Sequence, residues 1–525
     1  MSVEHPVLTS DSELDLEIAS RARAIELDNW GFFDVHRWSE YPEVNAAVNT
    51  IYLELTSNPS FSGQAKLRKK HIKVIILDLY VKWLQDPSMY SGFYRGKYYY
   101  DDLEARYNKL FISKLTIPIS DALSSMGYID YIQGHYNRNS SSSNKSHISR
   151  MRAKHKLIDL IESAGIKPDM VEIAPNTECI ILRSYSEKKK QQQDVDYNDS
   201  DDPRISEWRL NLLAYNNLLR RTYIDVPSAP EEGMPTRSKR ALRRGRTSKK
   251  VKVNQLNKFV RRIFNNGNWN NGGRFYGGWW QRIPKDWRTK IRIWNSPVTE
   301  IDYSGLHIVL LYSKEGITYR EDPYILEGYE KSEEMRSLLK LVLLASINAN
   351  DKNKALQAVH KDVNFDPDRF GWVKEEGINL SQVIEAFKNK HSRISDLYFF
   401  SGEGVRLQNI DSRIAEHVIN HFTHQNIPVL CVHDSFVIQT DKAEELKTVM
   451  THAFNDAISQ IEIAPETEPK VTFGGLELGQ WQDIISRPEW REVMIGYLTG
   501  WHTYPKWNER LNAFKARKLE NYYIA

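Results

Sequence analysis

Two segments in the second half of the chain have the pattern of strands that end in a carboxylate. Residues Val298–His307 form a short extended run that passes into a helical pattern over Ile308–Leu311. Residues Ile427–Ile438 are apolar on both sides of a His-Asp-Ser centre, as expected of a buried hairpin with the acid at its turn. The patterns predict neighbouring strands that carry Asp302 and Asp434. Phosphoryl transfer uses such pairs, because two carboxylates can hold metal ions about 3.5 to 4 Å apart.

A helical pattern between these segments carries two cations on one face. Apolar positions from Met335 to Val342 follow helical spacing, and Arg336 and Lys340 are an i, i+4 pair that projects from the same side. Such a pair suits a triphosphate, although the same spacing is common on solvated helix faces. Its position between two strand-borne acids favours the functional interpretation. A second amphipathic pattern, Leu446–Ala457, predicts a helix that packs behind the sheet.

The first half of the chain has a helix-and-hairpin pattern interrupted by polar stretches. The predicted helix Ile119–Met126 is followed by the strand pattern Gly127–Ile132, a polar loop and a second strand pattern, Ser149–Ala153. This order resembles a winged-helix DNA-binding unit, and a purely structural helix and hairpin fits it equally well. The polar stretches Asn139–Lys145 and Glu187–Asp202 have too few apolar residues to pack and predict flexible surface segments.

Composition narrows the class of protein. A chain of 525 residues predicts two or three compact units, and its 41% apolar and 27% charged residues are typical of a globular protein. The net charge is only +4, but residues Arg237–Lys252 contain nine basic side chains and no acid. Such a run favours a polyanionic partner, and a solvated linker is the alternative. We expect Arg243, Arg244 and Arg246 in this run to contact nucleic acid.

The cysteine content and the apolar runs bear on the cellular location. Cys179 and Cys431 are the two cysteines, and neither has a metal-ligand or disulfide-framework spacing. The first residues contain no apolar signal region, and no stretch approaches the roughly 18 apolar residues of a membrane-spanning helix. The sequence therefore predicts a cytoplasmic protein with no membrane partner.

Several ordered motifs together resemble one enzyme superfamily. The two acidic segments and the helix between them are similar to motifs A, B and C of family A DNA polymerases and single-subunit, phage-type RNA polymerases. Upstream, Gly273–Gly277, Gln281–Pro284 and Arg288–Arg292 are similar to that superfamily's Gly-Arg, Gln-Asn-Ile-Pro and Arg-x-x-Ile-Arg elements, in the same order. The resemblance covers Asn271–Ile458, about a third of the chain.

The resemblance implies an α+β right-hand polymerase fold with palm, fingers and thumb, and a role for each matching residue. It implies that Asp302 and Asp434, with the backbone carbonyl of Tyr303, hold two Mg²⁺ ions, for which Mn²⁺ can substitute. The implied partners are nucleoside triphosphates and a DNA primer-template. The implied nucleotide-binding residues are Arg336, Lys340, His307 and Asn348. The implied nucleic-acid contacts are Arg274, Gln281, His433 and Gln408. A histidine that only satisfies a tight turn is the alternative for His433.

Two departures from the family pattern concern the sugar of the nucleotide. Family A DNA polymerases usually have Glu at the position of His307 and Tyr at the position of Asn348, and these positions form the gate that senses the 2′-hydroxyl. His307 is bulky enough to obstruct that hydroxyl, which favours dNTPs. The His-Asp-Ser-Phe hairpin instead matches phage-type RNA polymerases. DNA synthesis is therefore the favoured prediction, with RNA polymerase or primer-synthesising activity as the alternative.

Other classes remain as rivals. A metal-dependent nuclease would use paired carboxylates but has no need of a triphosphate-binding helix. A degenerate polymerase that only binds DNA would have no reason to keep two acids beside two cations. Asp15-Leu16-Glu17 lacks a preceding apolar strand, so no proofreading exonuclease is expected.

The patterns divide the chain into four expected regions. Residues 1–165 form an α-rich N-terminal region that contains the possible winged helix, and residues 166–204 form a flexible connector. Residues 205–270 contain thumb-like helices, beginning with the helical pattern of Arg204–Tyr223, and the basic segment. Residues 271–525 form palm and fingers with a C-terminal extension. By analogy, such a chain suits a phage, a plasmid or another mobile element.

Overall fold

The structure is a computed structural model in which two compact units are distinguished, Met1–Thr177 and Glu178–Ala525. It describes residues 29–57, 61, 64–96, 100, 105–135, 147–187, 191–236, 250–459, 471–473, 476–477, 510–512 and 514–515. Arg243, Arg244 and Arg246 of the basic run lie outside the described residues. The boundary between the units falls inside the segment 166–204.

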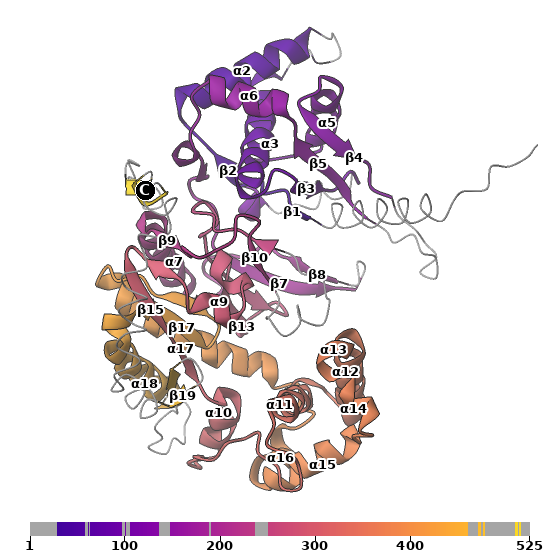
Figure 1. The fold of residues 1–525 in the computed structure, drawn as a ribbon, viewed down its shortest axis with the longest axis vertical. Helices are drawn as coiled ribbons and strands as arrows, with labels where there is room; N and C mark the ends of the chain where they lie inside the picture. The colour runs from indigo at the N-terminus through magenta and orange to yellow at the C-terminus, as the bar shows by residue number, and fades with distance from the viewer. Residues whose placement is uncertain are drawn as a thin grey trace, which may run out of the picture. The chain divides into compact units, whose positions relative to one another are not determined.

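The first unit contains a four-stranded sheet with the order β1-β3-β5-β4, in which β1 is parallel to β3 and the other pairs are antiparallel. Its strands are β1 (Trp30–Phe32), β3 (Tyr90–Phe93), β4 (Ile129–Ile132) and β5 (Ser149–Ala153). Its helices are α2 (Pro42–Thr56), α3 (Ala65–Gln85), α5 (Thr116–Ser125) and α6 (His155–Ser163). A small pair, β2 (Arg37–Trp38) and β6 (Glu172–Ile173), and the short helices η2 (Ala105–Tyr107) and η3 (Pro168–Met170) complete it (Figure 1).

Helix α3 forms the core of this unit because every residue from Ile72 to Val81 is buried. Its one acid, Asp78, is fully enclosed. The Asp78 carboxylate accepts hydrogen bonds from Lys82 Nζ at 2.5 Å and from Ser91 Oγ on β3 at 2.6 Å. A buried charge is tolerated only when it is paired in this way, so these bonds fix α3 against the sheet.

The predicted helix and hairpin of this unit are present as α5, β4 and β5, with Ile129 opposite Ala153 in the antiparallel pair. However, α5 contains no basic residue. Its acid, Asp121, accepts a bidentate pair from Arg95 at 2.5 and 2.8 Å. The charge of α5 therefore does not favour contact with phosphates, and DNA binding by this helix stays a prediction.

The second unit contains the sheet that carries both predicted acids. Its main path is β16-β17-β15-β14-β9, and β18 pairs with β15 and with β19. The strands are β9 (Ile224–Asp225), β14 (Arg292–Ile293), β15 (Ser296–Tyr303), β16 (Leu430–Val432), β17 (Ser435–Gln439), β18 (Val471–Phe473) and β19 (Leu476–Glu477). The helices α17 (Gly404–His424) and α18 (Ala443–Ser459) pack against each other, and α18 also contacts β15 and β17. The predicted amphipathic helix behind the sheet is thus confirmed, with Leu446, Met450 and Phe454 buried.

A second sheet in this unit has the order β13-β12-β7-β8. It consists of β7 (Ile180–Ser186), β8 (Gln191–Asp194), β12 (Arg261–Asn265) and β13 (Asn268–Tyr276), with β12 parallel to β7. The segment 166–204, expected to be a flexible connector, therefore supplies two strands of a sheet. The apolar run from Cys179 to Leu182 explains this, because these four residues are buried.

The segment 205–270, expected to hold thumb-like helices, contains α7 (Ile205–Arg221) and then strands. Besides β9 and β12, these include the pair β10 (Met234–Pro235) and β11 (Lys250–Val251). Helix α7 packs on α17, and Tyr215 Oη donates to the Val429 carbonyl at 2.7 Å. In the part that the structure describes, this segment is joined to the sheets rather than forming a separate helical unit.

Helices make up the part of this unit between β15 and β16, and Figure 1 shows α11 to α16 grouped together. They are α10 (Leu306–Lys314), α11 (Glu333–Asn348), α12 (Lys352–Phe365), α13 (Pro367–Phe370), α14 (Trp372–Glu375), α15 (Leu380–Lys390) and α16 (Ser392–Tyr398). Short elements η4 (Trp279–Arg282), α9 (Lys285–Arg288) and η5 (Thr440–Lys442) complete the unit. Ser332 caps α11 by accepting from Met335 N at 3.1 Å, which satisfies one free backbone donor.

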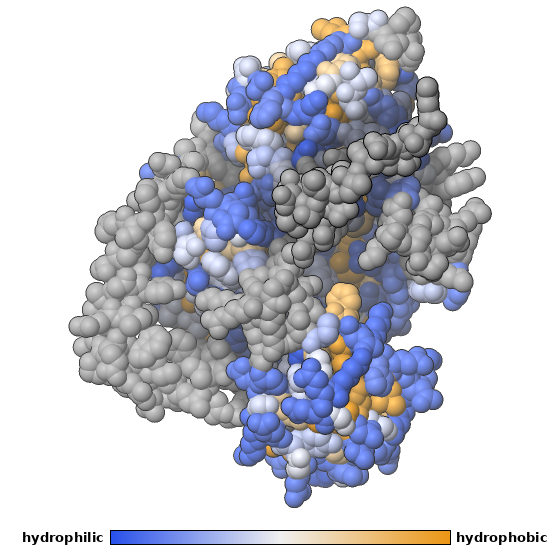
Figure 2. All heavy atoms as spheres, turned by 45° about the vertical axis from the view of Figure 1, so that its right-hand side comes forward, coloured by the Kyte–Doolittle hydropathy of each residue, from blue (hydrophilic) through white to orange (hydrophobic). Residues whose placement is uncertain are grey.

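The fold class is α+β, as predicted. Hydrophilic residues dominate the described surface on the face drawn in Figure 2, with smaller apolar groups between them. Among the described residues, no helix is both long and apolar enough to cross a membrane.

Candidate active site

Asp302 and Asp434 lie on adjacent strands of the large sheet. Strand β15 pairs with β17 so that Asp302 is opposite Ser435, and Asp434 precedes Ser435 in the turn between β16 and β17. Tyr303 N lies 3.5 Å from the Asp434 carbonyl. The pairing register therefore brings two carboxylates that are far apart in sequence to one end of the sheet.

The surroundings of the Asp302 carboxylate favour a proton or a cation there. Burial and the neighbouring Asp434 raise the pKa of Asp302 to about 7, and the positive fields of Lys285 and Lys340 oppose this rise. Like charges held close together favour a proton or a cation between them. Lys285 begins α9, and its proximity to Asp302 was not predicted, because no local pattern distinguishes it from other surface lysines.

A buried ion pair fixes the strand and the hairpin beside these acids. Arg288 donates to both oxygens of Glu300, at 2.7 and 3.1 Å. Ser435 Oγ donates to the same carboxylate at 2.7 Å, and Glu300 is 3% exposed. Arg288 and Ser435 belong to motifs identified in the sequence, so part of what these motifs do is to position the strands.

The two carboxylates of Asp302 and Asp434 suit a cation that a substrate also holds. No group of three or more His, Cys, Asp or Glu side chains able to hold a metal ion occurs within the described ranges. Mg²⁺ commonly uses one or two carboxylates together with substrate phosphates and water rather than a complete protein cage. The pair Asp302 and Asp434 matches this pattern.

Tyr303 contributes only its backbone to this end of the sheet. Its hydroxyl donates to the Met450 carbonyl on α18 at 2.5 Å, and its ring lies 6.4 Å from that of Phe454. The side chain is therefore part of the core between β15 and α18. That the backbone carbonyl of Tyr303 helps to hold Mg²⁺ remains a prediction.

Arg336 and Lys340 share a face of α11 that covers the ring of Tyr324. The Arg336 guanidinium lies 5.0 Å from the centre of this ring and Lys340 Nζ lies 5.9 Å from it. Burial raises the pKa of Tyr324, and the charge of Asp434 raises it further. Tyr324 therefore lies against both cations, and the charge of Asp434 acts on its hydroxyl. It was missed in the sequence, where it stands in a loop without periodic pattern.

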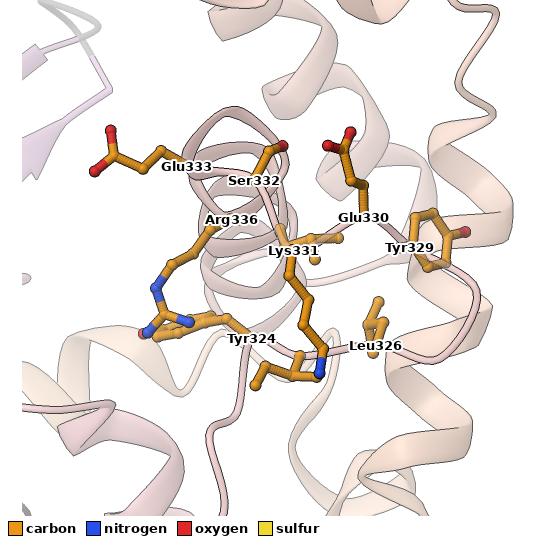
Figure 3. A pocket seen from close by; sticks show the side chains of 10 residues that line it. Tyr324, Leu326, Tyr329, Glu330, Lys331, Ser332, Glu333 and Arg336 are labelled. Atoms are coloured by element: carbon orange, nitrogen blue, oxygen red, sulfur yellow. The ribbon is translucent and has the colours of Figure 1, made fainter.

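Arg336 has a partner that a phosphate could replace. Its Nη1 donates to Asp322 at 2.6 Å, and the Arg336 side chain is 45% exposed. An ion pair this exposed contributes only about 0 to 1 kcal/mol. Figure 3 shows Arg336 extending over Tyr324 beside a pocket of about 240 Å³ that is also lined by Tyr329, Lys331 and Ser332.

Arg274, His307 and Asp411 form a second cluster beside these acids. The Arg274 guanidinium is bidentate to the Asp411 carboxylate, which is 1% exposed, and His307 Nε2 lies 3.1 Å from Asp411 Oδ2. Gly273 makes this approach of β13 to α17 possible. Its φ is 82°, and a Cβ there would lie 2.8 Å from Ser412 Oγ. Asp411 lies in the stretch Gln408–Ser412, which was expected to contact the template, but its pairing with Arg274 and His307 was not predicted, because an acid inside a helix carries no signal of its own.

Gln281, Gln408 and Asn348, which were also predicted, lie outside the two clusters described above. Gln281 donates to the carbonyls of Phe275 and Cys431 at 2.9 and 3.0 Å and accepts from Gly277 N at 3.0 Å, which ties β13 to β16. Gln408 is half-buried on α17, three residues before Asp411. The Asn348 side chain donates to the Leu344 carbonyl at 2.7 Å at the exposed end of α11.

His433 is held in an unusual backbone conformation. Its φ is 62°, and its ring is 5.4 Å from that of Tyr276 in an edge-to-face arrangement. Burial lowers its pKa, so the neutral form is favoured. Positive φ is a sparsely populated conformation for residues other than glycine, and it often occurs at functional turns.

Comparisons with known proteins give limited information. No protein-family model matches the sequence, and no curated protein matches it. Part of the chain is similar to a solved structure, the polymerase domain of Pol1 from M. smegmatis in complex with DNA primer-template and dNTP, at 15% identity and a TM-score of 0.24. The match covers 45% of this chain and 49% of that chain. A TM-score this low does not establish a shared fold.

Proposed function

We propose that the chain is a nucleotidyltransferase, a template-directed DNA polymerase that extends a primer and does not proofread. The observation that carries this proposal is the placement of Asp302 and Asp434 at the same end of adjacent strands, where the positive charge of Lys340 opposes the rise in the pKa of Asp302. A pair of acids beside a helix face with two cations suits a substrate that carries both a metal ion and a triphosphate.

The reaction joins a primer 3′-hydroxyl to an incoming nucleotide. The hydroxyl oxygen gives its proton to water and forms a bond to the α-phosphorus, the bond from that phosphorus to the bridging oxygen breaks, and pyrophosphate leaves with the electron pair. Bound Mg²⁺, which Asp302 and Asp434 would hold, supplies activation of the hydroxyl and stabilisation of the leaving oxygen. Arg336 and Lys340 bind the triphosphate and compensate the charge that moves onto pyrophosphate.

The cluster around Asp411 serves the sugar and the primer-template in this proposal. His307 obstructs the 2′-hydroxyl, while Arg274, Gln281, His433 and Gln408 line the path of the nucleic acid. Asn348 completes the gate. The basic run with Arg243, Arg244 and Arg246 contributes contacts to phosphates that do not depend on sequence. The buried thiols of Cys179 and Cys431 are free, which suits the cytoplasmic location proposed for the enzyme.

The test is primer extension with dNTPs or NTPs on DNA and RNA templates with Mg²⁺. We expect dNTP incorporation on DNA, and a loss of at least about 100-fold in Asp302→Asn and Asp434→Asn with DNA affinity retained. Asp441→Asn is the matched control, because Asp441 is exposed at the other end of the same hairpin.

The outcomes separate the rival classes. Incorporation of NTPs alone would assign the chain to RNA or primer synthesis. Metal-dependent cleavage of DNA without synthesis would assign it to the nucleases. Binding of DNA with neither activity would leave a DNA-binding protein. Full synthesis by either aspartate variant would refute the assignment of the site.

A further inference from the structure

An exposed phenylalanine stands at the tip of a loop in the first unit. Phe111 lies between η2 and α5, its side chain is 61% exposed, and its φ is 53°. This left-handed conformation is unfavourable for a bulky residue and persists only where the surroundings impose it. The loop therefore keeps an apolar ring exposed to solvent, and it does so with an unfavourable backbone conformation.

Asn108 holds the backbone of this loop closed. Its amide nitrogen donates to the Ile112 carbonyl at 2.8 Å, and its amide oxygen accepts from Ile112 N at 2.9 Å. Phe111 N donates to the Asn108 carbonyl at 2.8 Å. Asn108 and Ile112 are 7% and 1% exposed, so the base of the loop is buried while its tip projects.

His71 fastens the end of the loop to α3. Its Nε2 accepts from Ser113 N at 2.8 Å, and its Nδ1 donates to the Leu67 carbonyl at 2.9 Å. His71 is fully buried, and burial lowers its pKa, so it acts as a neutral link between α3 and the loop. The position of Phe111 is therefore set by a rigid frame.

One lysine lies beside the ring, and two more are exposed in the same loop. Lys70 Nζ lies 5.7 Å from the centre of the Phe111 ring, and the neighbouring Lys109 and Lys114 are exposed. Residues 64–73 and 105–116 contain basic side chains and no acid. An aromatic ring among cations is the arrangement with which proteins bind single-stranded nucleic acids, in which bases stack on rings and phosphates contact lysines.

We propose that Phe111, Lys70, Lys109 and Lys114 form a binding site for a single nucleic-acid strand, with an unpaired base stacked on Phe111. The proposal rests on the proposed function in taking nucleic acid as the partner of the chain. Charge complementarity favours this occupant, since a peptide would have to be strongly acidic. The rigid loop also lacks the amphipathic helix with which basic proteins commonly insert into membranes. The site gives the first unit a role in holding template or displaced strand that does not depend on α5.

The test measures binding of a fluorescent oligothymidylate to the full chain at several salt concentrations, without nucleotide or metal. Phe111→Ala is expected to weaken binding about 5- to 100-fold, as for the loss of one stacked base. Phe111→Trp keeps an aromatic ring and is expected to bind as tightly as the wild type. Phe111→Gly removes the ring and also relieves the positive φ. We expect it to bind as weakly as Phe111→Ala while its melting temperature is kept or raised.

Charge variants and a matched control complete the design. Lys109→Gln and Lys114→Gln are each expected to reduce the salt dependence of binding by about 0.7 in slope, whereas Phe111→Ala leaves the slope unchanged. Phe365→Ala is the control, because Phe365 is 77% exposed on α12, and binding should not change. Unaltered affinity in both Phe111→Ala and Phe111→Gly would overturn the proposal.

Vesicle binding and primer extension distinguish this site from a membrane contact and from the polymerase site. Phe111-dependent binding to phosphatidylserine vesicles but not to the oligonucleotide would overturn the proposal in favour of a membrane contact. Primer extension tests the proposed function independently. Oligonucleotide binding that depends on Phe111 in a chain without synthesis would support this site while refuting the polymerase assignment. Active synthesis together with oligonucleotide binding that does not depend on Phe111 would support the polymerase assignment and refute this site.

Discussion

At the scale of single residues, the side chains beside the paired acids are held by contacts that join distant parts of the chain. His307 shares the buried carboxylate of Asp411 with Arg274, and this fixes the imidazole at the first turn of α10. A gate for the sugar needs such a fixed side chain, because discrimination by steric exclusion is lost when the obstructing group can move aside.

The first prediction concerns His307→Ala. In the proposed function the imidazole obstructs the 2′-hydroxyl, so its removal should admit NTPs while most dNTP activity remains. The ratio of kcat/KM for dNTP over NTP should fall by an amount equivalent to about 1 to 3 kcal/mol. Wild-type enzyme that already prefers NTPs, or a ratio unchanged by the substitution, would contradict the role of His307.

The second prediction concerns Asp411→Asn. The variant keeps the shape of the side chain and removes the charge that holds Arg274 and His307, so sugar discrimination should fall in the same direction as in His307→Ala. Stability should decrease by about 1 to 3 kcal/mol, because a partly buried guanidinium loses its anion. Denaturant unfolding and the dNTP to NTP ratio are the measurements. Loss of stability with an unchanged ratio would leave Asp411 a purely structural residue.

At the scale of elements, the site depends on the face that helix α11 presents and on how closely strand β13 approaches helix α17. Helix α11 presents Arg336 and Lys340 on one face because they are one turn apart, and that face lies over Tyr324. Strand β13 approaches α17 closely enough for Arg274 to reach Asp411. Periodicity explains the first arrangement, and the absence of a Cβ at Gly273 explains the second.

The third prediction tests the face of α11. Arg336→Ala and Lys340→Ala should each lower kcat/KM for the nucleotide about 10- to 100-fold, since charge-assisted hydrogen bonds contribute about 1.5 to 3 kcal/mol. Lys354→Ala on α12 is the control, because its side chain is 63% exposed and its ion pair with Asp351 lies within one helix turn. Steady-state kinetics unaltered in both test variants would show that this face is only solvated.

The fourth prediction tests the close packing of β13. Gly273→Ala places a methyl group 2.8 Å from the Phe264 ring and from Ser412 Oγ at a φ of 82°. We expect a loss of about 1 to 3 kcal/mol in the free energy of unfolding, from overpacking added to backbone strain. Gly328→Ala is the control, because its φ is 80° with nothing within 4 Å of a Cβ. Equal losses in the two variants would mean that strain alone is responsible.

At the scale of the whole molecule, two of its basic stretches differ in chemistry. The face around Phe111 combines cations with an exposed ring in the first unit. The run from Arg237 to Lys252 is basic without an aromatic residue, which suits contact with phosphates alone. Both stretches should therefore contribute to the salt dependence of nucleic-acid binding, but only the one around Phe111 should contribute base stacking.

The fifth prediction concerns that run. Replacing Arg243, Arg244 and Arg246 by Gln should weaken binding to duplex DNA of any sequence. The slope of log affinity against log salt should fall by about 0.9 for each phosphate that the variant no longer neutralises. Filter binding or fluorescence anisotropy across salt concentrations measures this. A slope identical to that of the wild type would make the run a linker.

The sequence alone was enough to predict the elements that carry the paired acids and the cations. Strand patterns around Asp302 and Asp434 and the helical spacing of Arg336 and Lys340 are local properties, since backbone periodicity determines which side chains share a face. The hairpin turn and the helix behind the sheet follow from the same periodicity. The roles of these residues rest on the resemblance of their order to known polymerases.

Only the tertiary structure decided which distant residues meet. Arg274 and Asp411 are 137 positions apart and His307 and Asp411 are 104 apart, so no local pattern could pair them. Tyr324 and Lys285 join the site, and β7 and β8 join a sheet, for the same reason. Such contacts arise when separate elements bury their apolar faces together, and burial then decides which charged side chains must find a partner.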